Sequence, residues 1–179
     1  MKKILLTIMT IIMFSGCSGT LLNTPTKKVE MFFNKYQSLD DDVMNQLKDV
    51  VNNEISFTKE QGLSYIEIMK KHYQSLKYRI KDEVIDGNTA VVTVEIEVID
   101  YSDILKNADN YLKENESEFM KNGKIDEKLF NDYRLNKLKS AKDKVKYTID
   151  MTLTNVDGKW ELDEVSRDTK DKIHGVYYK

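Results

Sequence analysis

The segment Leu76–Val98, with the sequence LKYRIKDEVIDGNTAVVTVEIEV, decides the fold that this chain is expected to adopt. Apolar and polar residues alternate on both sides of a turn signal, Asp86–Asn88. The apolar positions are Leu76, Tyr78, Ile80 and Val84 before the turn and Val92, Val94, Ile96 and Val98 after it. Alternation with a period of two is typical of a strand that buries one face. The segment therefore predicts an antiparallel β-hairpin.

Residues of matching character face one another if Asp86–Asn88 forms a three-residue loop. The predicted pairs are Ile80 with Val94, Tyr78 with Ile96, Arg79 with Glu95 and Lys77 with Glu97. The agreement of apolar and charged pairs supports this register. The charged face is either a binding surface or the solvated side of the sheet, and the second interpretation is favoured because antiparallel sheets often leave one face wet.

Asp82 departs from the pattern, since it occupies the apolar phase between Ile80 and Val84. A buried carboxylate at this position would have a raised pKa and could serve as a general base. The alternative is a β-bulge or strand end at Lys81–Glu83, which would turn the side chain toward water. This alternative is favoured.

Three amphipathic helices are predicted before the hairpin. The first spans Pro25–Tyr36, because Thr24 suits the N-cap and a proline follows at the first helical position. The second begins at the acidic triplet Asp40–Asp42, which is expected to cap it, a cation site being the alternative interpretation. At the start of the third helix, Thr58 and Gln61 have capping-box spacing.

A further helical region, Tyr101–Lys144, is predicted after the hairpin. Two apolar stripes separated by Asn122–Gly123 indicate a helical hairpin, which is expected to lay its apolar faces on the sheet. Alternation resumes over Val145–Thr154, and Asp157–Gly158 is a two-residue hairpin signal. The pairs expected across this turn are Leu153 with Leu162 and Asn155 with Trp160. Ser166–Gly175 is expected to form a short final helix.

These elements predict one α+β domain, residues 24–179, with N-terminal helices packed on a curved antiparallel sheet and a helical hairpin inserted between strands. The arrangement resembles the nuclear transport factor 2-like, cystatin-like cone. Three segments also resemble a group of Firmicute lipoproteins: Thr24–Glu30, Tyr147–Trp160 and Lys172–Tyr177. The resemblance implies a cone with a possible cavity, in a superfamily of isomerases, dehydratases and non-enzymatic binding modules, so it selects no single function.

The candidate catalytic residues are Asp82 and His72. His72 lies near the end of the third predicted helix, where it could partner a carboxylate in acid/base chemistry. The simpler interpretation is that His72 is a protonated histidine near a helix C-terminus, where positive charge is favoured. The same interpretation applies to His174. The two histidines lack the spacing of a metal motif, and no nucleophile elbow, phosphate-binding loop or dinucleotide fingerprint occurs. The sequence therefore predicts neither a metal nor a cofactor.

The chain begins with a segment typical of a secretion signal, residues 1–16, with Lys2 and Lys3 before the apolar run Ile4–Phe14. This run is shorter than the about 20 residues that a membrane-spanning helix needs. Phe14–Cys17 resembles the lipobox of bacterial lipoproteins, which implies cleavage before Cys17 and attachment of lipid to its thiol. An ordinary secretion signal with a chance cysteine is the alternative. Residues 17–23 would then form a short tether.

The mature chain would carry 26 basic residues, the 28 of the whole sequence minus Lys2 and Lys3, against 30 acidic ones. This balance argues against nucleic acid as a partner. The membrane, reached through lipid on Cys17, is the expected partner, with a small ligand, a peptide or an envelope protein as further candidates. The preferred function is a membrane-anchored extracytoplasmic binding module. The alternatives are an acid/base enzyme that uses Asp82 and His72, and a structural envelope lipoprotein.

Overall fold

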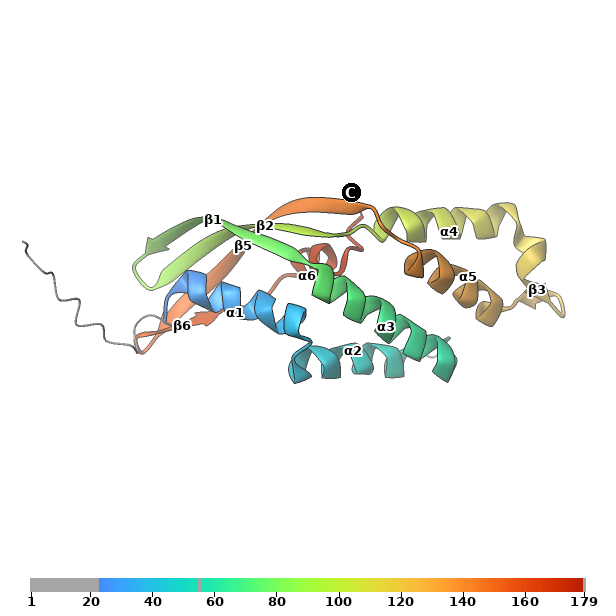
Figure 1. The fold of residues 1–179 in the computed structure, drawn as a ribbon, viewed down its shortest axis with the longest axis horizontal. Helices are drawn as coiled ribbons and strands as arrows, with labels where there is room; N and C mark the ends of the chain where they lie inside the picture. Colours follow the sequence, from blue (N-terminus) through green and yellow to red (C-terminus); the bar gives the residue numbers. More distant parts are fainter. Residues whose placement is uncertain (1–22, 55, 179) are drawn as a thin grey trace, which may run out of the picture.

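The computed structural model describes residues 23–54 and 56–178, and it has the predicted α+β architecture of helices and a curved antiparallel sheet (Figure 1). The expected signal, Cys17 and most of the tether lie outside these residues. The helices are α1 Pro25–Ser38, α2 Asp41–Asn53, α3 Lys59–Ser75, α4 Ser102–Glu114, α5 Glu127–Lys139 and α6 Arg167–His174. The sheet contains, in spatial order, β1 Lys77–Asp86, β2 Thr89–Ile99, β5 Lys144–Val156 and β6 Lys159–Leu162. Between α4 and α5 lie a 3₁₀ turn, Glu116–Phe119, and the short strands β3 Met120–Lys121 and β4 Lys124–Ile125.

The predicted helix caps are present. Thr24 accepts a hydrogen bond from the backbone of Lys27, and Thr58 forms a reciprocal capping box with Gln61. Asp40 accepts from the backbone N–H of Asp42, so the acidic triplet caps α2 as predicted. Each such cap stabilises its helix by about 1 kcal/mol, because it satisfies a donor that the helix leaves unpaired.

The predicted register of the β1–β2 hairpin is confirmed, but the turn differs from the prediction. Asp86 pairs with Thr89, so the turn has two central residues rather than three. The turn is therefore one residue shorter than predicted, and a β-bulge leaves Lys81 of β1 without a partner in β2. The shorter turn and the bulge compensate each other, so Ile80 still pairs with Val94 as predicted. The expectation that Val84 shares the buried face is wrong. The bulge reverses the alternation between Ile80 and the turn, and Val84 is 58% exposed.

The core lies between the inner face of the sheet and the helices α1, α3 and α6. The alternating residues of β2 and β5 that line it are Val92, Val94, Ile96, Val98, Tyr147, Ile149, Met151 and Leu153. From the helical side, Phe33 stacks on Tyr78 with 5.0 Å between ring centroids. Ile173 of α6 is also completely buried. A fully buried aliphatic or aromatic side chain contributes about 1.5–3 kcal/mol, so this layer supplies most of the stability.

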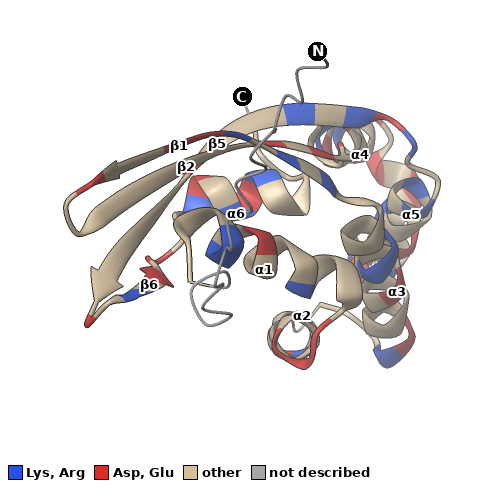
Figure 2. Cartoon of the chain, turned by 60° about the vertical axis from the view of Figure 1, so that its left-hand side comes forward, with Lys and Arg blue, Asp and Glu red and all other residues tan. Residues whose placement is uncertain are grey.

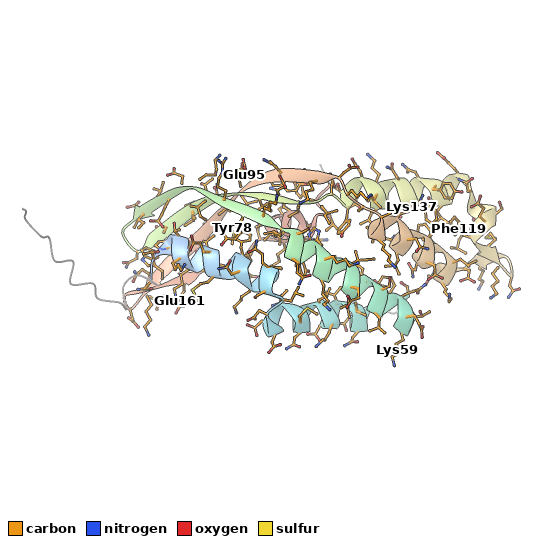
Figure 3. All side chains as sticks on the ribbon, in the orientation of Figure 1. Lys59, Tyr78, Glu95, Phe119, Lys137 and Glu161 are labelled. Carbon is orange, nitrogen blue, oxygen red and sulfur yellow. The ribbon has the colours of Figure 1, made fainter. Side chains whose placement is uncertain are left out.

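The outer face of the sheet carries charges of both signs (Figure 2). Glu95 lies 3.4 Å from Arg79, and Lys146 lies 3.8 Å from Glu97, in side chains that remain open to solvent. Figure 3 shows Glu95 on the side away from α1 and Tyr78 on the side that faces it. Such exposed pairs contribute little stability. This supports the interpretation of a solvated face.

The helical insert, α4 and α5 with the turn between them, packs against α3 and extends past the end of the sheet (Figure 1). The expectation that it would lie on the sheet is wrong. Gln61 of α3 holds the insert, because its amide donates to the carbonyl of Lys128 at 2.9 Å and to the carboxylate of Asp132 at 2.7 Å. Asn122–Gly123 forms the β3–β4 turn rather than a helix end.

The insert begins and ends at adjacent points of the sheet. The strands β2 and β5, which flank it in the sequence, pair directly from Thr89 with Thr154 to Ile99 with Lys144. Beyond this ladder, the backbone N–H of Asp100 donates to the carbonyl of Asp143 at 2.9 Å. The insert is therefore a long excursion between two neighbouring strands of one sheet.

Candidate functional site, a cavity among the helices

The structure places Asp82 on the exposed side of β1, at the predicted bulge. It pairs with Thr93 of β2, and its carboxylate accepts a hydrogen bond from the backbone of Glu83 at 3.0 Å. His72 is completely buried in α3. The two candidate catalytic residues therefore do not form a common site.

His72 contacts the end of a different helix from its own. Its Nε2 lies 2.8 Å from the carbonyl oxygen of Ile173 near the C-terminus of α6, and its Nδ1 has no partner within the described residues. Burial lowers its pKa from 6.5 to about 4. The ring is therefore neutral at neutral pH, and the interpretation of a cation at a helix C-terminus is wrong for this residue.

His174 pairs with Tyr73, the residue beside His72. The Tyr73 hydroxyl lies 3.0 Å from Nδ1 of His174. Burial lowers the pKa of His174 to about 4 and raises the pKa of Tyr73. The shared proton consequently remains on the tyrosine at neutral pH, so this pair is poorly matched to proton transfer.

A cavity of about 200 Å³ lies between α2, α3, the insert and the segment after α6. Its apolar and aromatic lining consists of Val50, Phe57, Tyr65, Met69, Tyr101, Leu105, Leu135, Leu138 and Val176. Its polar lining consists of Glu54, Ser56, Asn131 and Arg134. No residue of the sheet lines it. An apolar concavity with a few polar groups is the usual form of a small-molecule site.

One face of α5 forms part of the cavity wall. Asn131, Arg134, Leu135 and Leu138 follow at helical spacing and point to the same side. Asn131 is buried, and its amide donates to the carbonyl of Ser56 at 3.1 Å. The loop between α2 and α3 is thereby fixed against α5, which shapes the mouth of the cavity.

Arg134 is the basic group of this cavity. Its guanidinium lies 5.5 Å from the centre of the Phe130 ring, one turn earlier in α5. Within the described residues it forms no ion pair within 4.0 Å and no side-chain hydrogen bond. Glu54, the acidic group of the lining, is exposed and accepts two hydrogen bonds from Ser56, at 3.3 Å from the backbone and at 2.8 Å from the hydroxyl.

Two tyrosines complete the polar lining. Burial raises the pKa of Tyr65, while the charge of Arg134, which lines the same cavity, acts in the opposite direction. Burial also raises the pKa of Tyr101 to about 12, with a contribution from Tyr65. Both phenols are therefore neutral hydrogen-bond donors at physiological pH. Neither hydroxyl has a partner within the described residues, and neither is enclosed by protein.

A second cavity of about 200 Å³ adjoins the first and shares Val50, Tyr65, Met69 and Val176 with it. It extends past α2 to Tyr73 and His174.

Across residues 23–54 and 56–178, no group of three or more histidine, cysteine, aspartate or glutamate side chains could hold a metal ion. The groups that the site offers to a ligand are an arginine and two phenols.

The sequence patterns did not mark Arg134, Tyr65 or Tyr101 as residues of a site. A signal was available for Arg134. It stands on the apolar side of its helix, between Phe130 and Leu138, where a charged residue is uncommon.

No family model matches this chain, and no curated protein matches it. Among solved structures, the fold is similar to that of a Bacillus subtilis protein (ycdA) described provisionally as a lipoprotein. The TM-score is 0.44 at 14% sequence identity, and the match covers 77% of this chain and 46% of that one. The present chain thus spans less than half the length of that protein. Similarity at this level leaves the function to be argued from the site.

Proposed function

We propose that this protein is an extracytoplasmic lipoprotein, anchored to the membrane through Cys17, that binds a small ligand in the cavity among its helices. The observation that carries the binding role is the cavity of about 200 Å³, in which Arg134 and two tyrosine hydroxyls lack protein partners. The guanidinium is half-buried and both hydroxyls are open to solvent, so these donors are available to a ligand that enters the apolar cavity.

The position of Asn23 supports an anchored arrangement. Its side chain donates to the carbonyl of Gly158 at 2.7 Å and accepts from the backbone N–H of Trp160 at 3.0 Å. The chain therefore joins the fold at the β5–β6 turn, at the end of the sheet away from the helical insert (Figure 1). No helix within the described part of the chain is long and apolar enough to cross a bilayer.

The short tether then sets the orientation of the protein. Five residues, Ser18 to Leu22, separate Cys17 from Asn23, which is hydrogen-bonded to the fold. They reach roughly 20 Å when extended. Lipid on Cys17 would hold the sheet turns close to the bilayer, and the insert with its cavity would project outward, where a soluble ligand has access.

Metabolic labelling with radioactive palmitate tests the anchor. The native protein is expected to take up label and to fractionate with membranes, whereas Cys17→Ala is expected to lose both properties. A Ser18→Ala variant is the matched control and should retain them. Equal labelling of the Cys17→Ala variant and the native protein would contradict the proposed anchor.

A ligand screen with a blocked cavity tests the binding role. Val50 lines the cavity and is 57% exposed, so Val50→Trp should fill its mouth without disturbing the core. Met31, which is 47% exposed on α1, provides the matched control Met31→Trp. Small molecules that raise the melting temperature of the native protein should keep this effect with Met31→Trp and lose it with Val50→Trp. If every hit acts equally on both variants, the cavity is not the binding site.

A further inference from the structure

We propose that the cavity among the helices binds a small organic carboxylate whose apolar part is about the size of one aromatic ring, with Arg134 holding the carboxylate. This inference rests on the proposed binding function and specifies the chemical class of the ligand. It follows from the charge, the hydrogen-bonding groups and the size of the cavity.

The charge of the ligand follows from the difference between the two ionised side chains in the lining. Glu54 is exposed and already accepts two hydrogen bonds from Ser56. Arg134 is only half-buried, but it has no acidic partner within the described residues. A guanidinium binds a carboxylate through two parallel hydrogen bonds, and this geometry is stronger and more specific than a single neutral contact.

The neighbouring tyrosines favour the same class of ligand. Tyr65 and Tyr101 line the same cavity as Arg134. Both hydroxyls are protonated and can donate. A carboxylate only accepts hydrogen bonds, so it suits a cavity whose lining includes a guanidinium and two phenols.

The size of the cavity limits the apolar part of the ligand. A cavity of about 150 Å³ holds benzene, and pockets for drug-sized molecules start near 300 Å³. The present volume of about 200 Å³ lies between these values. Phe57, Leu105 and Leu135 provide an apolar surface for one ring or a short branched chain, with Arg134 beside it.

Calorimetric titration of the full-length chain in phosphatidylcholine nanodiscs tests the proposal, with phenylacetate as the probe and neutral phenylacetamide of the same shape as its control. Phenylacetate is expected to bind, and Arg134→Gln should weaken its binding by about tenfold or more, because a charge-assisted pair is lost. Arg167 lies on α6, with a side chain that is 93% exposed, so Arg167→Gln is the matched control and should leave binding unchanged. Phenylacetamide should bind more weakly and should not respond to Arg134→Gln.

The outcomes separate this inference from the proposed function. Equal binding of the acid and the amide, both abolished by Val50→Trp, would keep the binding role and overturn the carboxylate. Binding of neither probe, together with a ligand screen that yields no cavity-dependent hit, would overturn both.

A free acid and a peptide terminus share the chemistry of a carboxylate beside an apolar group. Titration with the tripeptide Gly-Gly-Phe separates these two sources. Binding tighter than that of phenylacetate assigns the site to a peptide C-terminus, and weaker binding assigns it to a free acid. Both results require the same loss of affinity in Arg134→Gln, and a peptide that binds independently of Arg134 would count against the inference.

Discussion

The Nε2 atom of His72 lies 2.8 Å from the carbonyl oxygen of Ile173, and this contact joins the end of α3 to the end of α6 inside the core. The carbonyl is one of those that a helix leaves unpaired at its C-terminus, so the imidazole N–H satisfies it. Because the ring is completely buried, only its neutral form is compatible with this packing.

Stability should therefore fall in mild acid. The pKa of His72 is about 4 in the folded protein, against 6.5 for the free side chain, because burial disfavours the charged form. The unfolded chain takes up a proton between these values and the folded protein does not. His72 therefore contributes up to about 3 kcal/mol to the free energy of unfolding. This contribution is complete above pH 6.5 and is lost as the pH falls to 4.

Chemical denaturation at intervals from pH 4 to pH 7 measures this slope in the native protein and in His72→Gln, which can still donate to Ile173. The slope should be smaller in His72→Gln. His174→Gln should also reduce the slope, because burial lowers the pKa of His174 to about 4 as well. Identical slopes in the native protein and in His72→Gln would show that His72 titrates normally.

Gly175 should not tolerate a side chain. It ends α6 with a φ of 72°, and a Cβ atom there would clash with the carbonyl oxygen of Ile99. Gly87 has a similar φ of 56° but open space around it. Denaturant unfolding should show a loss of about 1 kcal/mol for Gly87→Ala, from the left-handed backbone alone. Gly175→Ala should lose about 3 kcal/mol or more, because the backbone of β2 must also move. Similar losses in the two variants would mean that the contact with Ile99 relaxes freely.

Removal of Lys81 should leave the register of the hairpin unchanged. Without this residue the bulge is lost, but Asp82 can still pair with Thr93 and Ile80 with Val94, so Tyr78 and Ile80 stay on the inner face. The deletion should therefore lower the free energy of unfolding by about 1 kcal/mol or less, and Lys81→Ala, which retains the bulge, should change it by about 0.5 kcal/mol or less. Circular dichroism with urea unfolding would measure both. A loss of about 3 kcal/mol or more in the deletion variant would mean that the fold requires the bulge.

Gln61 should govern how firmly the insert is held. Its side chain both closes the capping box of α3 and donates to Lys128 and Asp132 of α5. Gln61→Leu should therefore cost about 2 kcal/mol and make the β3–β4 turn more sensitive to limited proteolysis. Gln74 is exposed on the same helix, so Gln74→Leu is the matched control and should leave proteolysis unchanged. Equal cleavage rates in the two variants would argue against this role.

The pairs across each hairpin could be predicted because they depend on the sequence of the strands themselves. Arg79 opposite Glu95 and Asn155 opposite Trp160 are both found as expected. The turn at Asp86–Asn88 could not be predicted in the same way. A short turn with a bulge and a long turn without one give the same pairing beyond Ile80, and alternation alone does not distinguish them.

The position of the insert could not be predicted from its apolar stripes. A stripe shows that a helix buries one face, but it does not identify the element that covers this face. In this protein the insert packs against α3 rather than against the sheet. The cavity depends on this packing, because Arg134 reaches Tyr65 only when α5 lies beside α3. Its polar residues come from distant parts of the sequence, which is why no local motif marked them.

The hydrogen bond between Asp100 and Asp143 closes the base of the insert on the sheet. Everything between these two residues can be exchanged without altering a strand pair of the four-stranded sheet, since the cost of closing a loop rises only slowly with its length. A protein built in this way combines a constant sheet with an insert that can be replaced independently. Chimaeras that graft another helical hairpin onto this base should therefore retain the sheet.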